Sequence, residues 1–593
     1  MPPPVVDYAQ VANLAAMFFE RAERGGDAPF LWAKRAGAWR STSWRAAAAS
    51  AVALAKALRA HGLAAGERVM LVAENRPEWA IADLAIMTAG AITVPAYATA
   101  TAEDLRHVLI DSGARAVIVS SGLAARMLPV ARDARCELVV AIDPPANGGP
   151  AQDGLELLAW DALLAEGATL PGDARELAAA PKRDDIACLI YTSGTGGTPR
   201  GVMLTHANIL HNCWGAFDLI EELGRGDEIF LSFLPLSHSY EHSAGQFLAI
   251  SVGAQIYYAE GADRLAANLI ETRPTITTAV PRLFEAMHAR IEHQVKSHPR
   301  LRRWLFERTL ALGTKRYERA HEMSILERLL DRGLDRLVRA KVRARFGGRL
   351  KALVSGGAPL AYHDGVFFQA LGVPVFQGYG QTEASPFISC NRPRKIKLHT
   401  VGPPLLGVEL KIAEDGEILA RGEMVMKGYW GDAAATAATV RVGWLHTGDI
   451  GRLDEDGYLQ ITDRKKDIIV ISGGDNISPA KVEAELTREP EIAQAMVHGD
   501  KHPYLVAVLV PQEQLAERDE ASVQAVLASA LERANARLSA LERVRAFIVA
   551  GEPFTIANAM LTPTLKIRRH RIRDAHRDAL EALYHARPRA AAN

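Results

Sequence analysis

The hydrophobic pattern of the first part of the chain alternates between helical and strand periodicity. Ala and Leu from Trp44 onward recur at three- and four-residue spacing and end at Gly62, which predicts a helix. The apolar run 68–73 predicts a strand. The same pair of patterns then repeats, with helices expected at 77–90 and 102–113 and strands at 92–97 and 115–120. Strands that alternate with helices indicate an α/β fold with a parallel sheet covered by helices.

A second series of apolar runs follows, and each run ends at Gly or Pro. The predicted strands are 229–236, 255–260, 275–280, 350–357 and 373–380. Open α/β sheets bind ligands at strand ends that are followed by Gly-rich turns. We therefore expect a ligand site near the ends of these strands.

After Val401 the pattern changes to short alternating segments, which predicts a β-rich subdomain. Glu-Asp-Gly at 414–416 and again at 455–457 is a hairpin signal. After Arg464 the pattern is that of a small α/β domain, in which Ser478 is the expected N-cap of a helix that has Pro479 in its first turn. We place the domain boundary at 463–466.

Length, composition and charge narrow the class of protein. The 593 residues are too many for one hydrophobic core, so two to four domains or subdomains are expected. Lys plus Arg equals Asp plus Glu at 69 each, so the chain has no net positive charge that would attract a nucleic acid. The four cysteines lack metal-ligand spacing and are typical of a reducing compartment. The N-terminus has no signal-peptide pattern, and the longest apolar run is interrupted by Asp83, Gly90 and Pro95, so a soluble cytoplasmic protein is expected.

The segment 296–349 is helical and basic, with sixteen Lys or Arg against six Asp or Glu. Its apolar residues, among them Trp304 and Leu329, are spaced for one face of a helix. Two interpretations stay open. The segment is either a solvated helical hairpin or a surface that contacts anionic lipid headgroups, which would place the protein on the inner face of a membrane.

The run YTSGTGGTPRG, from Tyr191 to Gly201, follows the apolar strand 186–190. Glycines close together let backbone N–H groups converge into a nest for anions, and four Ser or Thr hydroxyls add donors. The run lacks the Gly-Lys-Ser/Thr ending of a P-loop. By itself it is either a phosphate-binding loop or a flexible turn.

Other motifs favour the phosphate-binding interpretation. The run Thr192–Gly201 resembles the phosphate-binding signature of adenylate-forming enzymes, the superfamily of acyl-CoA synthetases, luciferases and adenylation domains. This sequence departs from that signature at Gly196, in place of Thr, and at Arg200, in place of Lys. Further family motifs follow in order: LPLSH at 234–238, SGGAPL at 355–360, QGYGQTE at 377–383, GYW at 428–430, GWLHTGD at 443–449, DRKKD at 463–467, SGGDNISP at 472–479 and TPTLKIRR at 562–569. The long-chain fatty acyl-CoA synthetase branch is the most similar.

The resemblance implies a two-step reaction. A carboxylate attacks the α-phosphate of ATP, giving an acyl-adenylate and pyrophosphate, and the thiol of coenzyme A then attacks the acyl carbon and releases AMP. The implied fold is a large N-terminal domain, 1–463, a hinge, 464–466, and a small mobile C-terminal domain, 467–593. Fatty acid, ATP and coenzyme A are the implied substrates, with Mg²⁺ as the metal.

The resemblance also implies roles for individual residues. The phosphate loop comprises Thr192, Ser193, Gly194, Thr195, Gly196, Gly197, Thr198 and Arg200. Adenine is expected on Tyr379 and against the turn Gly356, Gly357, Ala358 and Pro359, and Gln377, Gly378 and Gly380 are expected among the other nucleotide-binding residues. Thr382 is expected to bind a phosphate, and Thr192 and Glu383 to bind Mg²⁺, since hard oxygen ligands suit that ion. Asp449 and Arg464 are expected at the ribose hydroxyls.

The C-terminal domain contributes a second set of implied residues. Lys566 is expected to reach the α-phosphate and the acyl carboxylate during adenylation. Lys466 is the expected hinge, and Gly473 and Gly474 would approach the pantetheine thiol after the domain rotates. His238 either borders the acyl site or is a core histidine.

Two alternatives remain open at this point. A fatty acyl-AMP ligase would load a carrier protein instead of coenzyme A, although the segment 472–479 and the hinge favour coenzyme A. A non-catalytic nucleotide-binding relative would explain Gly196 and Arg200, but the presence of Thr382, Glu383, Asp449, Arg464 and Lys566 argues against it.

Overall fold

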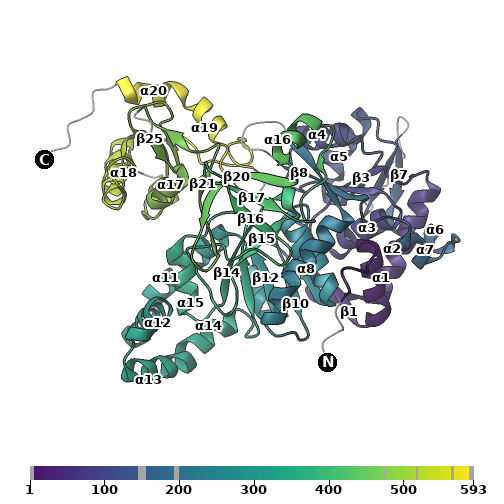
Figure 1. The fold of residues 1–593 in the computed structure, drawn as a ribbon, viewed down its shortest axis with the longest axis horizontal. Helices are drawn as coiled ribbons and strands as arrows, with labels where there is room; N and C mark the ends of the chain where they lie inside the picture. Colours follow the sequence, from purple (N-terminus) through teal and green to yellow (C-terminus); the bar gives the residue numbers. More distant parts are fainter. Residues whose placement is uncertain are drawn as a thin grey trace.

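The structure is a computed structural model that describes residues 6–143, 155–192, 199–472, 475–515, 518–562 and 566–585. A large body contains two eight-stranded sheets among these residues, and a smaller C-terminal body lies beside its β-rich part (Figure 1). The α/β class expected from the sequence is confirmed.

The first large sheet is mostly parallel and ends in two antiparallel strands, β9 and β18. Its order is β18 (Gly428–Tyr429), β9 (Arg200–Thr205), β8 (Ile186–Thr192), β4 (Ile92–Pro95), β3 (Arg68–Val72), β5 (Ala116–Val119), β6 (Leu138–Ala141) and β7 (Glu156–Ala159). The strands predicted at 68–73, 92–97 and 115–120 are therefore confirmed to within two residues.

The second large sheet has a parallel centre with an antiparallel strand at each edge. Its order is β15 (Phe387–Cys390), β14 (Val375–Gly380), β13 (Ala352–Ser355), β12 (Ile276–Ala279), β10 (Ile229–Ser232), β11 (Gln255–Tyr258), β1 (Pro29–Arg35) and β2 (Ala38–Ser43). All five strands predicted between 229 and 380 are present in this one sheet.

Helices form layers on both faces of the two sheets. The main core lies between the sheets around α1 (Leu14–Gly25), α2 (Trp44–Ala60), α3 (Pro77–Thr88) and α8 (His206–Glu222). The outer faces are covered by α4 (Ala102–Ser112) and α5 (Ser121–Asp133) on one side, and by α10 (Leu265–Thr272), α11 (Pro281–Lys296) and α15 (Tyr362–Ala370) on the other. Helix α3 shows why the layering forms. All its residues except Glu78 are buried, as expected for a helix that is apolar on every side.

Shorter helices complete the large body. They are α6 (Trp160–Thr169), α7 (Ala174–Ala179), a π-helix (Glu241–Leu248), α9 (Ala249–Val252), a 3₁₀ turn (Thr382–Ala384) and α16 (Ala433–Thr439). Helix α6 packs closely on α2.

A small antiparallel sheet follows, built from the hairpins that the sequence predicted. It contains β16 (Glu409–Ile412), β17 (Glu417–Arg421), β20 (Trp444–Leu453) and β19 (Val440–Arg441), and β21 (Leu459–Arg464) pairs with β20. Both Glu-Asp-Gly turns connect neighbouring strands, with positive φ at Gly416 and Gly457.

The C-terminal body has its own core and begins after β21. Its strands are β22 (Ile469–Val470), β23 (Asn476–Ile477), β24 (Ile492–His498), β25 (Leu505–Pro511) and β26 (Val544–Val549), with a 3₁₀ turn (Glu513–Leu515). Its helices are α17 (Pro479–Thr487), α18 (Glu520–Asn535), α19 (Arg569–Ala575) and α20 (Arg577–His585). Ser478 caps α17 by accepting from Lys481 N, which confirms that prediction.

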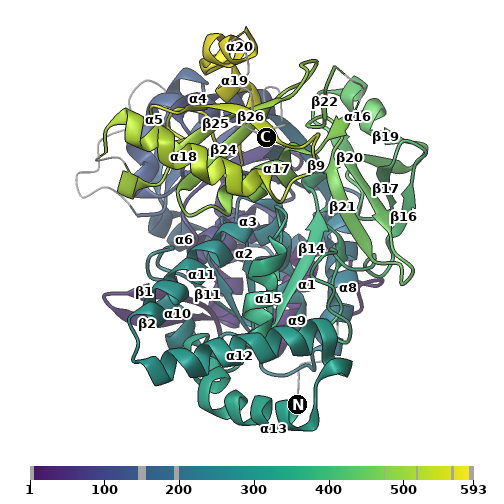
Figure 2. The same cartoon turned by 90° about the vertical axis from the view of Figure 1, so that its left-hand side faces the viewer.

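The basic segment forms a helical arm that extends from the large body away from the C-terminal body (Figures 1 and 2). It comprises α12 (Arg300–Arg319), a 3₁₀ turn (Ala320–Glu322), α13 (Ile325–Leu334), a π-helical turn (Asp335–Arg339) and α14 (Ala340–Arg345). In the described part of the chain, the helices are all too short or too polar to cross a bilayer.

Candidate active site

The site lies where β13 and β14 end, between the small sheet and the C-terminal body. After β13, Gly356 N donates to the carbonyl of Ala279 at 3.0 Å. A Cβ at Gly356 would meet the Tyr240 ring at 3.0 Å, and Gly357 has φ +80°, which other residues adopt only with strain. Ala358 and Pro359 are exposed. This turn therefore presents an open backbone surface, as the nucleotide prediction requires.

Strand β14 holds the next predicted residues in place. The Gln377 side chain accepts from Leu360 N at 3.3 Å and donates to the carbonyl of Leu398, so it fixes the turn after β13. Gly378 faces the β15 backbone, and a Cβ on Gly380 would overlap the carbonyl oxygen of Pro386. Gln377 and Gly380 thus have structural reasons for their identity that the sequence did not reveal.

Tyr379, Asp449 and Arg464 form a bonded triplet. The Tyr379 hydroxyl donates to Asp449 Oδ2 at 2.6 Å, and Arg464 Nε lies 3.2 Å from Asp449 Oδ1. Asp449 and Arg464 are directly paired residues of β20 and β21. Burial and the Asp449 carboxylate raise the pKa of Tyr379. The structure therefore brings together three residues that the sequence assigned to adenine and ribose.

Thr382 and Glu383 lie on the 3₁₀ turn after β14. Thr382 Oγ1 is 2.9 Å from Ser239 Oγ, and Tyr429 donates its hydroxyl to Glu383 Oε1 at 2.8 Å. Glu383 is half-buried. Ser239 and Tyr429 are thus residues of the site that had no predicted role, although Ser239 directly follows the LPLSH motif and Tyr429 is part of the GYW motif.

The phosphate loop is described at its two ends. Thr192 ends β8 and pairs with Arg200, the first residue of β9. The Arg200 guanidinium lies 5.6 Å from the centre of the Tyr429 ring and 3.6 Å from an Asp432 oxygen. Tyr429 therefore lies between Arg200 and Glu383 and contacts both of them. The predicted residues Ser193, Gly194, Thr195, Gly196, Gly197 and Thr198, like Gly473 and Gly474, lie outside the described residues.

Lys566 reaches this site from the C-terminal body. Burial, with the nearby Arg464 charge, lowers its pKa to about 8, while Asp449 and Glu383 act in the opposite direction. Burial, with the Lys566 charge, lowers the pKa of His238 to about 3. His238 Nδ1 accepts from Tyr240 N at 3.1 Å. A lysine more than 180 positions away in sequence from Glu383 is thus part of the same electrostatic cluster.

The predicted hinge follows β21 without a break. Lys465 N donates to the carbonyl of Gly448 at 2.8 Å, and its ammonium pairs with Asp415 and Glu417 at 2.6 and 2.9 Å. The next residue, Lys466, is exposed in a turn. The two bodies are therefore joined by a chain that is held to the small sheet up to Lys465.

Comparisons with known proteins match nearly the whole chain. Residues 18–430 match the family model described as AMP-binding enzyme, and residues 466–588 match the AMP-binding enzyme C-terminal domain. The long-chain-fatty-acid–CoA ligase FadD15 of Mycobacterium bovis is 34% identical over 590 residues, which is 96% of this chain and 97% of the relative. The peroxisomal long chain acyl-CoA synthetase 6 of Arabidopsis thaliana is 30% identical over 90% of this chain and 80% of its own.

Solved structures share the fold at lower identity. The adenylation domain of a carboxylic acid reductase from Segniliparus rugosus, in complex with AMP and a co-purified carboxylic acid, superposes with a TM-score of 0.77 at 22% identity, covering 98% of this chain and 96% of that one. The o-succinylbenzoate coenzyme A synthetase of Bacillus subtilis, with ATP and magnesium, gives a TM-score of 0.69 at 22% identity over 93% and 98% of the two chains. The two-body fold expected from the sequence is therefore confirmed.

Proposed function

The chain belongs to the family of AMP-binding enzymes, and from that premise we propose that it is an ATP-dependent long-chain fatty-acid–CoA ligase. The fatty-acid carboxylate attacks the α-phosphate of ATP and pyrophosphate leaves. The coenzyme A thiol then attacks the acyl carbon and AMP leaves. The observation that carries this proposal is the 34% identity to a long-chain-fatty-acid–CoA ligase over 96% of the chain.

The nucleotide would lie between the turn after β13 and the Tyr379–Asp449–Arg464 triplet. The exposed backbone at 357–359 admits a flat base, and Tyr379 is oriented by its bond to Asp449. The Asp449 carboxylate can accept from ribose hydroxyls, and Arg464 holds that carboxylate in position. The triplet therefore orients the nucleoside.

The phosphates would lie toward the loop between β8 and β9. Thr192 and Glu383 offer oxygen ligands, which is the donor set that Mg²⁺ prefers, so the residues present fit that ion. When bound, Mg²⁺ would neutralise charge on the phosphates. Tyr429 keeps Glu383 oriented, and the Arg200 charge lies over the same tyrosine ring.

Lys566 would stabilise the charge that develops during adenylation. Its ammonium interacts electrostatically with Glu383 and Asp449. From there it would contact the α-phosphate and the attacking carboxylate. His238 is neutral at neutral pH because burial lowers its pKa to about 3, so it would act at the acyl side as a hydrogen-bond partner and not as a cation.

The second step would require a different placement of the C-terminal body if Lys566 occupies the side from which the thiol approaches. We assign the hinge to 464–466, with Lys466 as the residue whose backbone turns. Rotation would replace Lys566 by the segment that contains Gly473 and Gly474, where coenzyme A would bind.

A coupled pyrophosphate assay with carboxylates of increasing chain length, with and without coenzyme A, tests the proposed activity. We expect palmitate or oleate to release pyrophosphate over many turnovers, together with acyl-CoA and AMP, only when coenzyme A is present. If acyl-AMP accumulates and no thioester forms, the enzyme loads a different acceptor. If acyl hydroxamate cannot be trapped with any carboxylate from acetate to oleate, the chain is a non-catalytic relative.

We further propose peripheral contact with an anionic membrane through 296–349. Ile325, Leu326, Leu329 and Leu330 of α13 are 77, 79, 56 and 39% exposed. Their spacing places them on one side of the helix, while Asp331 and Leu334 are buried on the other side. The stripe, defined as these four residues, is thus turned to solvent, contrary to the usual arrangement of an amphipathic helix.

The charges around the stripe favour an anionic partner. Four of the six acidic residues already form ion pairs within the segment. The pairs are Glu322–Arg319, Glu327–Lys315, Asp335–Arg343, and Asp331 with both Arg316 and Arg339. Many further basic residues are exposed, among them Arg328, Arg332 and Arg336 beside the stripe. An exposed apolar stripe with a basic border fits an anionic lipid surface.

Vesicle cosedimentation tests the contact. We expect binding to phosphatidylglycerol vesicles and little binding to phosphatidylcholine vesicles, and we expect L326S/L329S/L330S to lose most of it. Val442→Ser is the control, because Val442 is 98% exposed in the turn between β19 and β20, far from the stripe in sequence. Equal binding by the triple variant and the wild type would refute the role of the stripe. A change of oligomeric state in the triple variant would instead identify the stripe as a contact between copies.

A further inference from the structure

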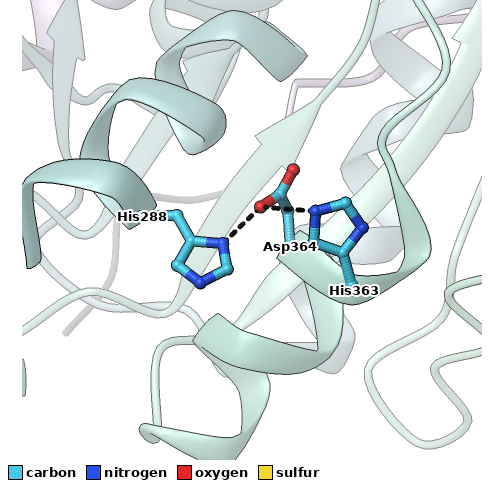
Figure 3. A group of neighbouring side chains, drawn as sticks. All are labelled: His288, His363 and Asp364. Atoms are coloured by element: carbon cyan, nitrogen blue, oxygen red, sulfur yellow. Dashed lines mark hydrogen bonds and ion pairs between the residues drawn. The ribbon is translucent and has the colours of Figure 1, made fainter. Parts of the chain in front are cut away.

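A cluster of His288, His363 and Asp364 lies outside the nucleotide site, on neighbouring helices of the large body. His288 is on α11, and His363 and Asp364 are in the first turn of α15. His288 Nδ1 is 2.5 Å and His363 Nε2 is 3.5 Å from the same oxygen, Asp364 Oδ1. Figure 3 shows both imidazole rings turned toward this oxygen. One ligand atom from each of the three residues lies within 4.8 Å of the other two.

The Asp364 carboxylate is the unusual member of the cluster. Its side chain is 3% exposed, and within the described structure its second oxygen, Oδ2, has no hydrogen-bond partner. A buried carboxylate oxygen without a donor is costly. The described hydrogen-bond donors of the protein therefore satisfy this carboxylate only at one of its two oxygens.

The surroundings of His288 resemble those of a metal-binding histidine. Its ring stacks on Phe367, with centroids 3.8 Å apart, which fixes its orientation. Its other nitrogen, Nε2, lies 3.5 Å from Glu292 Oε1. A metal-bound histidine usually has a carboxylate or carbonyl at its second nitrogen, which fixes the tautomer that leaves the first nitrogen free to coordinate.

We propose that His288, His363 and Asp364 form a binding site for a divalent transition metal of the Zn²⁺ class. Two imidazoles and one carboxylate suit zinc, and three protein ligands leave a fourth position for water. Zinc–ligand bonds of about 2.0–2.2 Å place tetrahedral ligand atoms roughly 3.3–3.5 Å apart. The separation of 3.5 Å at His363 already fits, and the 2.5 Å contact at His288 has to open by less than about 1 Å.

The placement of the cluster permits this adjustment. The His363 side chain is 45% exposed, so its ring can move without disturbing the core.

Zinc titration of the full-length protein, without a histidine tag and after dialysis against a chelator, tests the proposal. We expect one Zn²⁺ per chain by calorimetry and by elemental analysis after gel filtration, together with a rise in thermal midpoint. Co²⁺ in place of Zn²⁺ should give the visible absorption of a low-symmetry nitrogen and oxygen site. His363→Ala should weaken binding by at least about tenfold, as expected for loss of one ligand. Because His363 is half-exposed, this variant should fold normally.

Two control variants make the result specific. His498→Ala alters a second group of potential ligands, formed by His498, His502 and Glu581 on the C-terminal body, and His321→Ala removes a histidine that is 82% exposed. Both should bind Zn²⁺ as the wild type does. No binding by the wild type, unchanged binding by His363→Ala, or loss of binding in His498→Ala would each overturn the proposal.

Discussion

At the scale of single residues, the environment of Lys566 determines what the site can do. The ammonium group is desolvated and lies near Arg464, and the two carboxylates Asp449 and Glu383 compensate only in part, so its pKa falls to about 8. A lysine in this state is close to losing its charge under mild conditions. An anionic substrate stabilises the charged form, which links the charge of Lys566 to the presence of nucleotide and carboxylate.

The adenylation step should therefore have a basic limit. As the pH rises through about 8, Lys566 in the free enzyme loses its proton. It then loses the charge that we propose stabilises the transition state. We expect kcat/KM for ATP in ATP–pyrophosphate exchange to decline above that pH. Lys566→Arg, whose charge persists, should be slower but flat between pH 8 and 10. A wild-type profile that stays flat to pH 10 would contradict the lowered pKa.

At the scale of elements, close packing of helices on helices sets the requirement for small residues. Gly167 lies in α6, where α6 packs on α2, and a Cβ at this position would overlap the carbonyl oxygen of Ala53. A Cβ at Gly313 of α12 would likewise overlap the backbone of Ala370 in α15. Backbone atoms cannot give way as a flexible side chain can, so these helices must separate if either glycine is replaced.

Gly167→Ala should thus destabilise the large body by about 1–3 kcal/mol, the usual cost of overpacking. Gly333→Ala in α13 is the matched control, since a Cβ there meets nothing within 4 Å. The control should be neutral or more stable by up to about 1 kcal/mol through helix propensity. Thermal unfolding followed by circular dichroism measures both, and a Gly167→Ala midpoint equal to that of the wild type would disprove the close contact.

Much of the fold could be predicted from the sequence because its signals are local. The strands from Ile229 to Gly380 and the Ser478 cap follow from apolar runs and capping residues within a few positions. The bonds of Ser239 to Thr382 and of Tyr429 to Glu383 could not be predicted, since each joins residues from different elements. The outward orientation of the α13 stripe also depends on tertiary packing, which periodicity does not determine.

At the scale of the whole molecule, the two bodies meet at the candidate active site and are joined by one short link. At the start of that link, Lys465 forms ion pairs with Asp415 and Glu417 near the small sheet. The core of the C-terminal body begins at Ile469. The turn at 465–467 is therefore the place where we expect the proposed rotation to break the fewest contacts.

Restricting the backbone at Lys466 should separate the two half-reactions. Lys466→Pro fixes φ at an exposed position and should slow thioester formation more than adenylation. Lys466→Ala keeps the backbone free and serves as the control, with rates near those of the wild type. Single-turnover measurement of acyl-AMP and acyl-CoA gives both rates. Equal slowing of the two steps in Lys466→Pro would argue against a hinge at this residue.

The division of labour between the two bodies is the central claim, and Lys566→Ala tests it most directly. Acyl-AMP formation should fall by about 10²–10³-fold, the usual cost of removing a group that stabilises transition-state charge. Conversion of supplied acyl-AMP and coenzyme A to the thioester should stay within a few fold of the wild type, and Lys501→Ala, also in the C-terminal body, should leave both steps unchanged. Equal loss of both half-reactions in Lys566→Ala, or adenylation at the wild-type rate, would contradict the account.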